Sequence, residues 1–209
     1  YTLCCQWYTL HGRVQDAERY GYRGLRLLSR ERGFPRSAAW LIRAIAIGNA
    51  EPSRSEARLI ESVAILQDWL PQVSCSIEHE AWFYREMSEF YSEAHRYDEA
   101  ERTAEQGFQI IQRSDSIAEH QHAQVSRALV LCRVGQPRKA METLKPPEKP
   151  LPATQANYLL VLYEICCALG NTEQAVAVLA EAEQIAQQHA IQRALQTIQR
   201  LRQANAHEE

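Results

Sequence analysis

Four stretches of the chain place a turn-forming residue five positions before an alanine. The pairs are Gly12 and Ala17, His95 and Ala100, Gly135 and Ala140, and Gly170 and Ala175. Pro52 and Ala57 are the best candidates for a further pair between the first two. Successive alanines of this series lie 35 to 43 residues apart. Internal repeats of this length are typical of stacked helical hairpins.

The residues around each pair fit a hairpin of two helices. The turn former ends one helix and opens the next, and a small alanine early in the second helix allows close approach. We therefore expect an all-α fold, a right-handed α-α superhelix of about five hairpins plus a C-terminal capping helix. The expected units of this single domain, residues 1–209, are 1–34, 35–73, 78–115, 119–150 and 153–189, and the cap is 190–205.

Two segments modify this plan. The run KPPEKPLP at 145–152 cannot continue a helix, so the second helix of the fourth unit should end early. Residues 146–152 then form a connection, with a rigid linker favoured over a hinge. The chain begins at Tyr1 with neither a methionine nor a signal-peptide pattern, so we expect a fragment of a larger protein.

The third unit resembles a tetratricopeptide repeat. The residues that carry the resemblance are Tyr84, Met87, Ser88, Tyr91, Tyr97, Ala100, Gly107 and Phe108. The resemblance implies that Tyr91 and Tyr97 are bulky residues packed between helices and that Ala100 is the small residue that receives them. It also places His95 where the repeat usually has glycine.

Composition excludes several classes of partner. The net charge is −3 with both signs well mixed, so no basic surface for nucleic acid is expected. Polar residues interrupt every apolar run before it reaches the length of a membrane span. The six cysteines are interpreted as reduced thiols of a cytoplasmic protein: Cys4, Cys5, Cys75, Cys132, Cys166 and Cys167.

No motif for catalysis or for a cofactor is found. The eight glycines are scattered, without a phosphate-binding loop, and no serine nucleophile elbow occurs. Neither a C-x2-C pair nor an H-x3-5-H pair marks a metal site. On a helix, His120 and His122 of the cluster EHQH point in nearly opposite directions, which favours an interhelical surface. We expect a non-catalytic domain that needs neither a cofactor nor a metal ion.

The remaining candidates for function are polar residues on the first helix of each hairpin, the helix that lines the concave face of such a fold. By the repeat register they are Gln6, Thr9, Arg85, Glu89, Ser92, Arg133, Asn157 and Glu164. Trp82 and His122 lie near the starts of their helices and complete the set. The alternative is that these are ordinary solvated side chains, because every helical-repeat domain has a polar face.

Two kinds of helical-repeat protein are relevant to the function of these helices. Repeats that clamp a peptide carboxylate use basic side chains where this chain has Thr2, Gln6, Arg85 and Glu89, so a co-chaperone role is disfavoured. The segments LCRVGQPRKAMETL and YLLVLYEICCALGNTEQAVAVLAEAEQIAQQHAIQRAL resemble the sensor repeats of MalT-type bacterial transcription regulators. That resemblance implies binding of a protein, peptide or small effector in a signal-responsive regulator.

Three functions stay open at this point. The leading hypothesis is the recognition domain of a bacterial regulator, in the cytoplasm, without direct nucleic acid contact. The second is a scaffold for complex assembly, and the third is a signalling enzyme, either through its input domain or through a site in the concavity. Self-association is compatible with each of them.

Overall fold

The computed structural model describes residues 1–28, 36–50, 54–73, 76–148 and 150–205 of the 209-residue chain. These residues form eleven helices and no strand. The helices are α1 (Thr2–Leu10), α2 (Val14–Leu28), α3 (Arg36–Ala50), α4 (Glu56–Val73), α5 (Ile77–Glu93), α6 (Tyr97–Ile111), α7 (Ile117–Arg133), α8 (Pro137–Thr143), α9 (Pro152–Ala168), α10 (Thr172–Gln188) and α11 (Gln192–Asn205).

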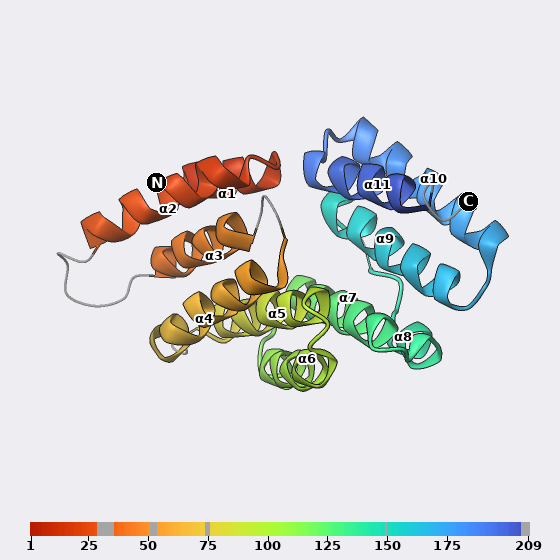
Figure 1. Cartoon of the computed structure of the whole chain (residues 1–209), viewed down its shortest axis with the longest axis horizontal. Helices are drawn as coiled ribbons and strands as arrows, with labels where there is room; N and C mark the ends of the chain where they lie inside the picture. The colour runs from red at the N-terminus through yellow and green to blue at the C-terminus, as the bar shows by residue number, and fades with distance from the viewer. Residues whose placement is uncertain (29–35, 51–53, 74–75, 149, 206–209) are drawn as a thin grey trace.

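Consecutive helices pack against each other, which confirms the predicted all-α fold of paired helices (Figure 1). Each odd-numbered helix also contacts the next odd-numbered one, from α1 through to α11. No two even-numbered helices are in contact within the described part of the chain. The odd-numbered helices therefore form an inner row and the even-numbered helices an outer row. The inner row curves until α1 meets α11, so the first and last helices lie side by side.

The turns within four of the hairpins, at Gly12, His95, Gly135 and Gly170, share one backbone geometry. Asn171 donates its backbone N–H to the Cys166 carbonyl at 2.9 Å, and Gly170 donates to the Cys167 carbonyl at 3.0 Å. This pair of bonds closes a helix end and requires a left-handed residue, for which glycine is favoured. Gly170 has φ of 76°, and His95 holds the equivalent position with φ of 57°. His95 therefore takes the backbone conformation of the glycine that it replaces.

The alanines that follow these turns lie in the core, as predicted. Ala17, Ala100, Ala140 and Ala175 are all buried. Ala57, in contrast, is exposed, so its assignment to the series was wrong. Before α4 the left-handed residue is Arg54, with φ of 40°, and five residues later comes the buried Leu59. The second unit therefore uses leucine at this position, and Pro52 lies outside the described residues.

The third unit follows the repeat pattern except at one tyrosine. Tyr91 packs against the buried cluster that contains Ala100. A Cβ at Gly107 would lie 2.9 Å from the Cβ of Tyr84, so α5 and α6 approach too closely for a larger residue. Tyr97 is 41% exposed, which contradicts its expected position between helices. It is the first residue of α6, where its ring extends beyond the helix contact.

The proline-rich run has the predicted effect on the fourth hairpin. α8 has only 7 residues, and the chain leaves it with an extended Leu144. Pro152 then occupies the first turn of α9, where its missing N–H has no intrahelical partner to lose. α7 and α9 contact each other directly, as do the other successive odd-numbered helices.

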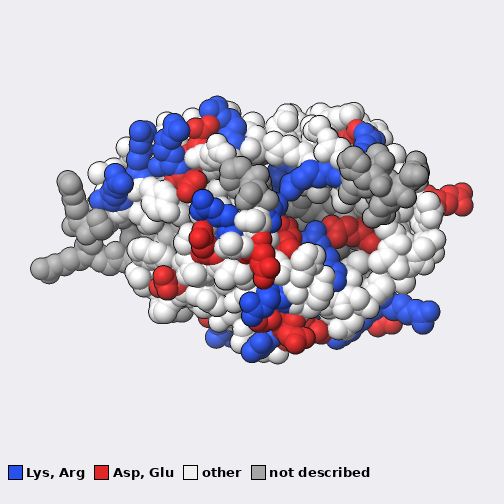
Figure 2. All heavy atoms as spheres, in the orientation of Figure 1, with Lys and Arg blue, Asp and Glu red and all other residues white. Residues whose placement is uncertain are grey.

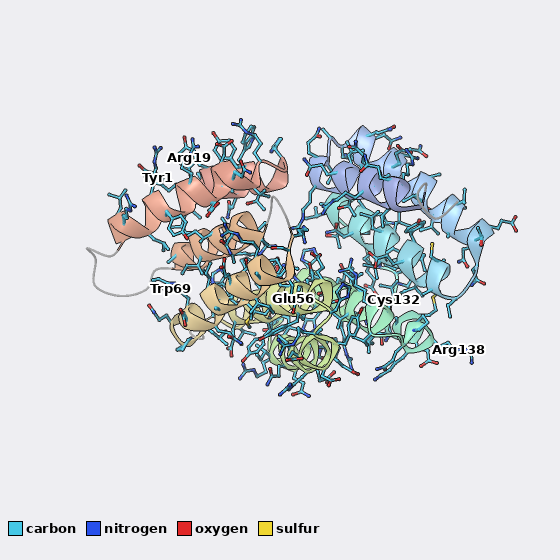
Figure 3. The ribbon with its side chains drawn as sticks, viewed as in Figure 1. Tyr1, Arg19, Glu56, Trp69, Cys132 and Arg138 are labelled. Carbon is cyan, nitrogen blue, oxygen red and sulfur yellow. The ribbon has the colours of Figure 1, made fainter. Side chains whose placement is uncertain are left out.

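Five of the six cysteines lie within the described residues, and all five are free thiols. Cys5, Cys132 and Cys166 are buried, whereas Cys4 and Cys167 are exposed. Burial raises the pKa of the Cys5 and Cys132 thiols to about 11, so both are protonated near neutral pH. Figure 3 shows Cys132 on α7 and Arg138 projecting from α8 at the periphery. Cys75 lies outside the described residues.

Candidate functional site

Charged side chains of the inner helices face one another across the middle of the molecule. We call this set the inner-face network; its members are Arg43, Arg54, Arg85, Glu86, Glu89, Glu93, Glu119, His122, Arg133 and Glu164. On α5, Glu86, Glu89 and Glu93 are three and four positions apart, the spacing of one helix face, and Arg85 adjoins Glu86. Figure 2 shows acidic and basic side chains interleaved over the middle of one face of the molecule.

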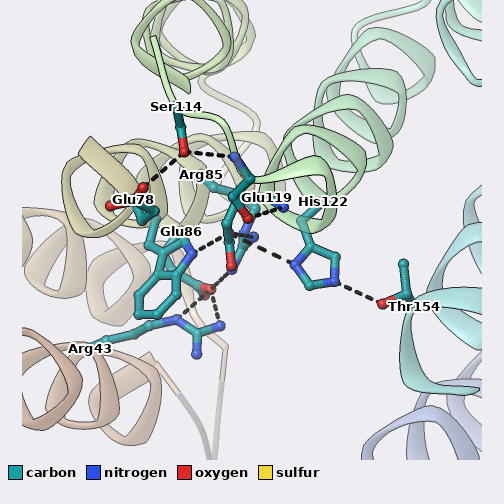
Figure 4. Close-up of polar contacts among 10 residues, drawn as sticks. Arg43, Glu78, Arg85, Glu86, Ser114, Glu119, His122 and Thr154 are labelled. Carbon is teal, nitrogen blue, oxygen red and sulfur yellow. Dashed lines mark hydrogen bonds and ion pairs between the residues drawn. The ribbon is translucent and has the colours of Figure 1, made fainter. Parts of the chain in front are cut away.

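The deepest part of the network joins α3, α5 and α7. Arg43 donates its Nε–H to Glu86 at 2.8 Å, and the two side chains are only 11% and 3% exposed. Arg85 lies 3.8 Å from Glu86 and 4.0 Å from Glu119 (Figure 4). Burial alone would raise the pKa of Glu86, but Arg43, Arg193 and Arg85 together hold it well below its usual range. Glu86 is therefore ionised at neutral pH.

Glu119, on α7, brings three of the predicted site residues together. Trp82 donates its indole N–H to this carboxylate, and Arg85 and His122 lie within 4.0 Å and 3.9 Å of it. His122 also forms a hydrogen bond of 2.9 Å with Thr154 of α9. Burial raises the pKa of Glu119, but these neighbours lower it below its usual value. The EHQH cluster is thus an interhelical contact between α5, α7 and α9.

A second, more accessible group joins the C-terminal ends of the same helices. Arg133 donates to both carboxylate oxygens of Glu164, at 3.0 Å and 2.9 Å, in the bidentate arrangement that arginine favours. It also lies 3.6 Å from Glu93, which forms an ion pair with Arg54. Arg133 and Glu93 are 28% and 27% exposed, so a ligand on the inner face can reach them.

Glu89 lies between these two groups. It accepts a hydrogen bond of 3.0 Å from the hydroxyl of Ser126 on α7. Burial and the neighbouring Glu86 raise the pKa of Glu89, although Arg193 and Arg85 act in the opposite direction. Arg193 belongs to α11, so the capping helix contributes positive charge to the inner face. With Arg193 included, the five glutamates are matched by five arginines.

Glu89→Gln is expected to raise the free energy of unfolding at pH 7. Because the pKa of Glu89 is higher in the folded chain than in the unfolded chain, its ionised form opposes folding. This opposition is absent below the unfolded pKa of about 4.3 and develops as the pH rises through the folded pKa. Glutamine keeps an oxygen for the Ser126 hydroxyl. Urea unfolding at pH 4 and pH 7 tests this, and a less stable variant at pH 7 contradicts it.

The other predicted positions have different environments. Asn157 is exposed on α9, three residues after Thr154 and seven before Glu164, and so shares the face of α9 that meets α7. Gln6 is half-buried on α1, and no contact between described residues joins it to the network. Thr9 and Ser92 were expected to be exposed but are buried. Their helices pack against neighbours along the inner row, and these neighbours cover both residues.

Sequence reasoning missed several members of the network. Arg43, Glu86 and Glu93 were not singled out, although Glu86 and Glu93 are seven residues apart and share one face of α5. A repeated charge on the face of a helix otherwise rich in apolar residues is the signal that could have identified them. Their partners could not be read from the sequence, because the pairs are 31 to 43 residues apart.

A recess lies on the outer side of the molecule, between α6, α7 and α8, and we call it the outer recess. Its volume is about 470 Å³, and two of its three cations have acidic partners within it. Arg127 is 2.6 Å from Glu105, and Lys139 is 3.4 Å from Glu101. The outer recess therefore offers mixed, paired charge and provides a natural comparison for the inner face.

The described residues contain neither a metal site nor a membrane span. No group of three or more His, Cys, Asp or Glu side chains is arranged to hold a metal ion. None of the described helices has the length and apolar character needed to cross a bilayer.

No protein-family model matches the chain, and no curated protein or solved structure is similar enough to count as a match. Its function has to be argued from its own side chains.

Proposed function

We propose that this chain is a non-catalytic helical-repeat recognition domain that binds a protein or peptide partner on its inner face, within a bacterial signal-responsive regulator. The partner contacts α5, α7 and α9, where Asn157, His122 and the pair Arg133–Glu164 are accessible. The deeper ion pairs hold these helices in register beneath the partner.

One observation carries this proposal: ion pairs, some of them largely buried, link α3, α5, α7 and α9 on the inner side of the row. Replacing a buried ion pair by apolar residues is often neutral or stabilising, so such pairs are weak devices for stability. Departures from the most stable packing are expected at functional sites. The exposure of the charged side chains increases from the buried Glu86 to the accessible Arg133 and Glu93. The inner face therefore presents charged groups of both signs to a partner.

A scaffold for complex assembly is the second candidate function. It is favoured by the outer recess of α6, α7 and α8, whose mixed charge also suits a protein surface. The role of an input domain in a signalling enzyme would use the same inner face, and it differs only in the module to which the domain is attached.

The proposal predicts that peptides selected on the domain bind to the inner face. Peptides are selected from a random-sequence phage library, and their affinities are then measured in solution by fluorescence anisotropy. Asn157→Ala and His122→Ala are expected to weaken binding about fivefold or more, the typical effect of losing an important interface residue. Asn171→Ala is the matched control, because Asn171 is exposed in the turn before α10 and its side chain makes no capping bond.

The choice of variants follows from burial. Arg85 and Glu89 lie deeper in the network, so their removal would also change stability, whereas Asn157 is exposed and the His122 side chain is 32% exposed. Peptides that bind normally to Asn157→Ala and His122→Ala, but poorly to Lys139→Ala in the outer recess, would contradict the inner-face proposal. That result would support the scaffold instead.

A further inference from the structure

A recess of about 380 Å³ lies where the first helices of the chain meet α11. One side comes from the N-terminal part of the chain, with Thr9 and Arg54 among its residues. The other side is α11, which contributes Arg193, Gln196 and Arg200. A Cβ at Gly12 would lie 2.4 Å from the side-chain amide of Gln196, so the turn before α2 lies directly against α11.

The α11 side of this recess is a regular polar stripe. Arg193, Gln196, Arg200 and Gln203 are three or four residues apart and therefore lie on one face of the helix. Arg202 lies on a different face, where it donates to both carboxylate oxygens of Glu183, at 2.9 Å and 2.6 Å. Arg193 and Arg200, which line the recess, thus lie on a different face of α11 from Arg202, which binds α10.

The charge of this recess differs from that of the inner-face network and of the outer recess. Three arginines line it, and none of the described lining residues carries a carboxylate. Arg54 is paired with Glu93, and Arg193 lies in the field of Glu86 and Glu89. Arg200 is exposed, and none of the contacts between described residues occupies its guanidinium group. Of the three arginines, Arg200 is thus the one without a carboxylate partner among the described residues.

We infer that this recess binds a small multivalent anion bearing phosphate or carboxylate groups. Guanidinium groups bind such oxygens with paired, charge-assisted hydrogen bonds, and the neighbouring amides and hydroxyl supply further donors. The volume, about 380 Å³, is in the range of small-molecule sites. Because the lining comes from both ends of the chain, a bound anion holds α11 against α1 and the turn at Arg54.

Isothermal titration calorimetry at low ionic strength tests this inference with inorganic pyrophosphate and citrate as probes. Binding of either anion is expected, and the one that binds identifies the preferred group. Arg200→Gln and Arg193→Gln should each weaken that binding about tenfold or more, the effect of losing a charged hydrogen-bond donor. Arg202→Gln is the matched control on the same helix and should bind as the parent does.

Two results would overturn the inference. One is the absence of binding for both anions, and the other is an equal loss in Arg202→Gln, which would indicate non-specific attraction to a basic helix. Arg200→Gln keeps the test valid if Arg193→Gln fails to fold, since Arg200 has no packing role in the described contacts. The inference goes beyond peptide recognition and fails separately from it, because Asn157 and His122 lie outside the recess.

Discussion

Glu86→Gln is expected to lower the free energy of unfolding at pH 7 by about 3–5 kcal/mol, the usual cost of removing one partner of a buried ion pair. The variant leaves Arg43 without its anion, and Arg43 is almost fully enclosed. Arg85 and Arg193 lose the same compensating charge. Urea unfolding followed by circular dichroism measures the change.

The pH dependence of this effect has a definite sign. The pKa of Glu86 is lower in the folded chain than in the unfolded chain, so its stabilisation is present above the unfolded pKa of about 4.3. This stabilisation is lost as the pH falls through the folded pKa. The difference in free energy of unfolding between the parent and Glu86→Gln should therefore become smaller in acid. Glu61→Gln is the matched control, because its pair with Arg58 is exposed and contributes about 1 kcal/mol or less. Equal losses in the two variants would contradict the account of the network.

Ala100→Leu is expected to lower the free energy of unfolding by about 1–3 kcal/mol. Ala100 is fully buried between α5, α6 and α7, against Tyr91 and Val130. The added carbon atoms have no free space there and must displace these neighbours. Thermal and urea unfolding provide the measurement.

Ala57→Leu is the control for this change, since the substitution is identical and Ala57 is exposed near the start of α4. Its effect should stay within about 0.5 kcal/mol. If Ala57→Leu lowers the free energy of unfolding as much as Ala100→Leu does, this would contradict the register in which Leu59, and not Ala57, is the buried residue of the second unit.

These two alanines also show what the sequence could and could not predict. The turn at His95 and the burial of Ala100 follow from local chemistry, because the turn conformation and the helix contact recur within a few residues. In the second unit the turn is at Arg54, a residue with no turn preference that the pattern could detect. Pro52 and Ala57 match the repeat pattern better than Arg54 and Leu59 do. The predicted register of the second unit was therefore two residues too early.

The candidate site was only partly predictable, for a physical reason. Polar residues on first helices could be named from the repeat, and Trp82, Arg85 and His122 do lie around one carboxylate. Their partners depend on the curvature that brings α3, α5, α7 and α9 together, and the repeat spacing does not encode that curvature. The contribution of Arg193 depends on the contact between the first and last helices, which no local pattern indicates.

The central claim is that the inner row of helices is the recognition surface. Hydrogen–deuterium exchange of the domain, with and without a selected peptide, tests it most directly. Protection is predicted on the inner helices α5, α7 and α9, around Asn157 and His122, with little change on α6, α8 and α10. Protection confined to α6, α8 and α10 would contradict the claim and place the partner on the outer surface.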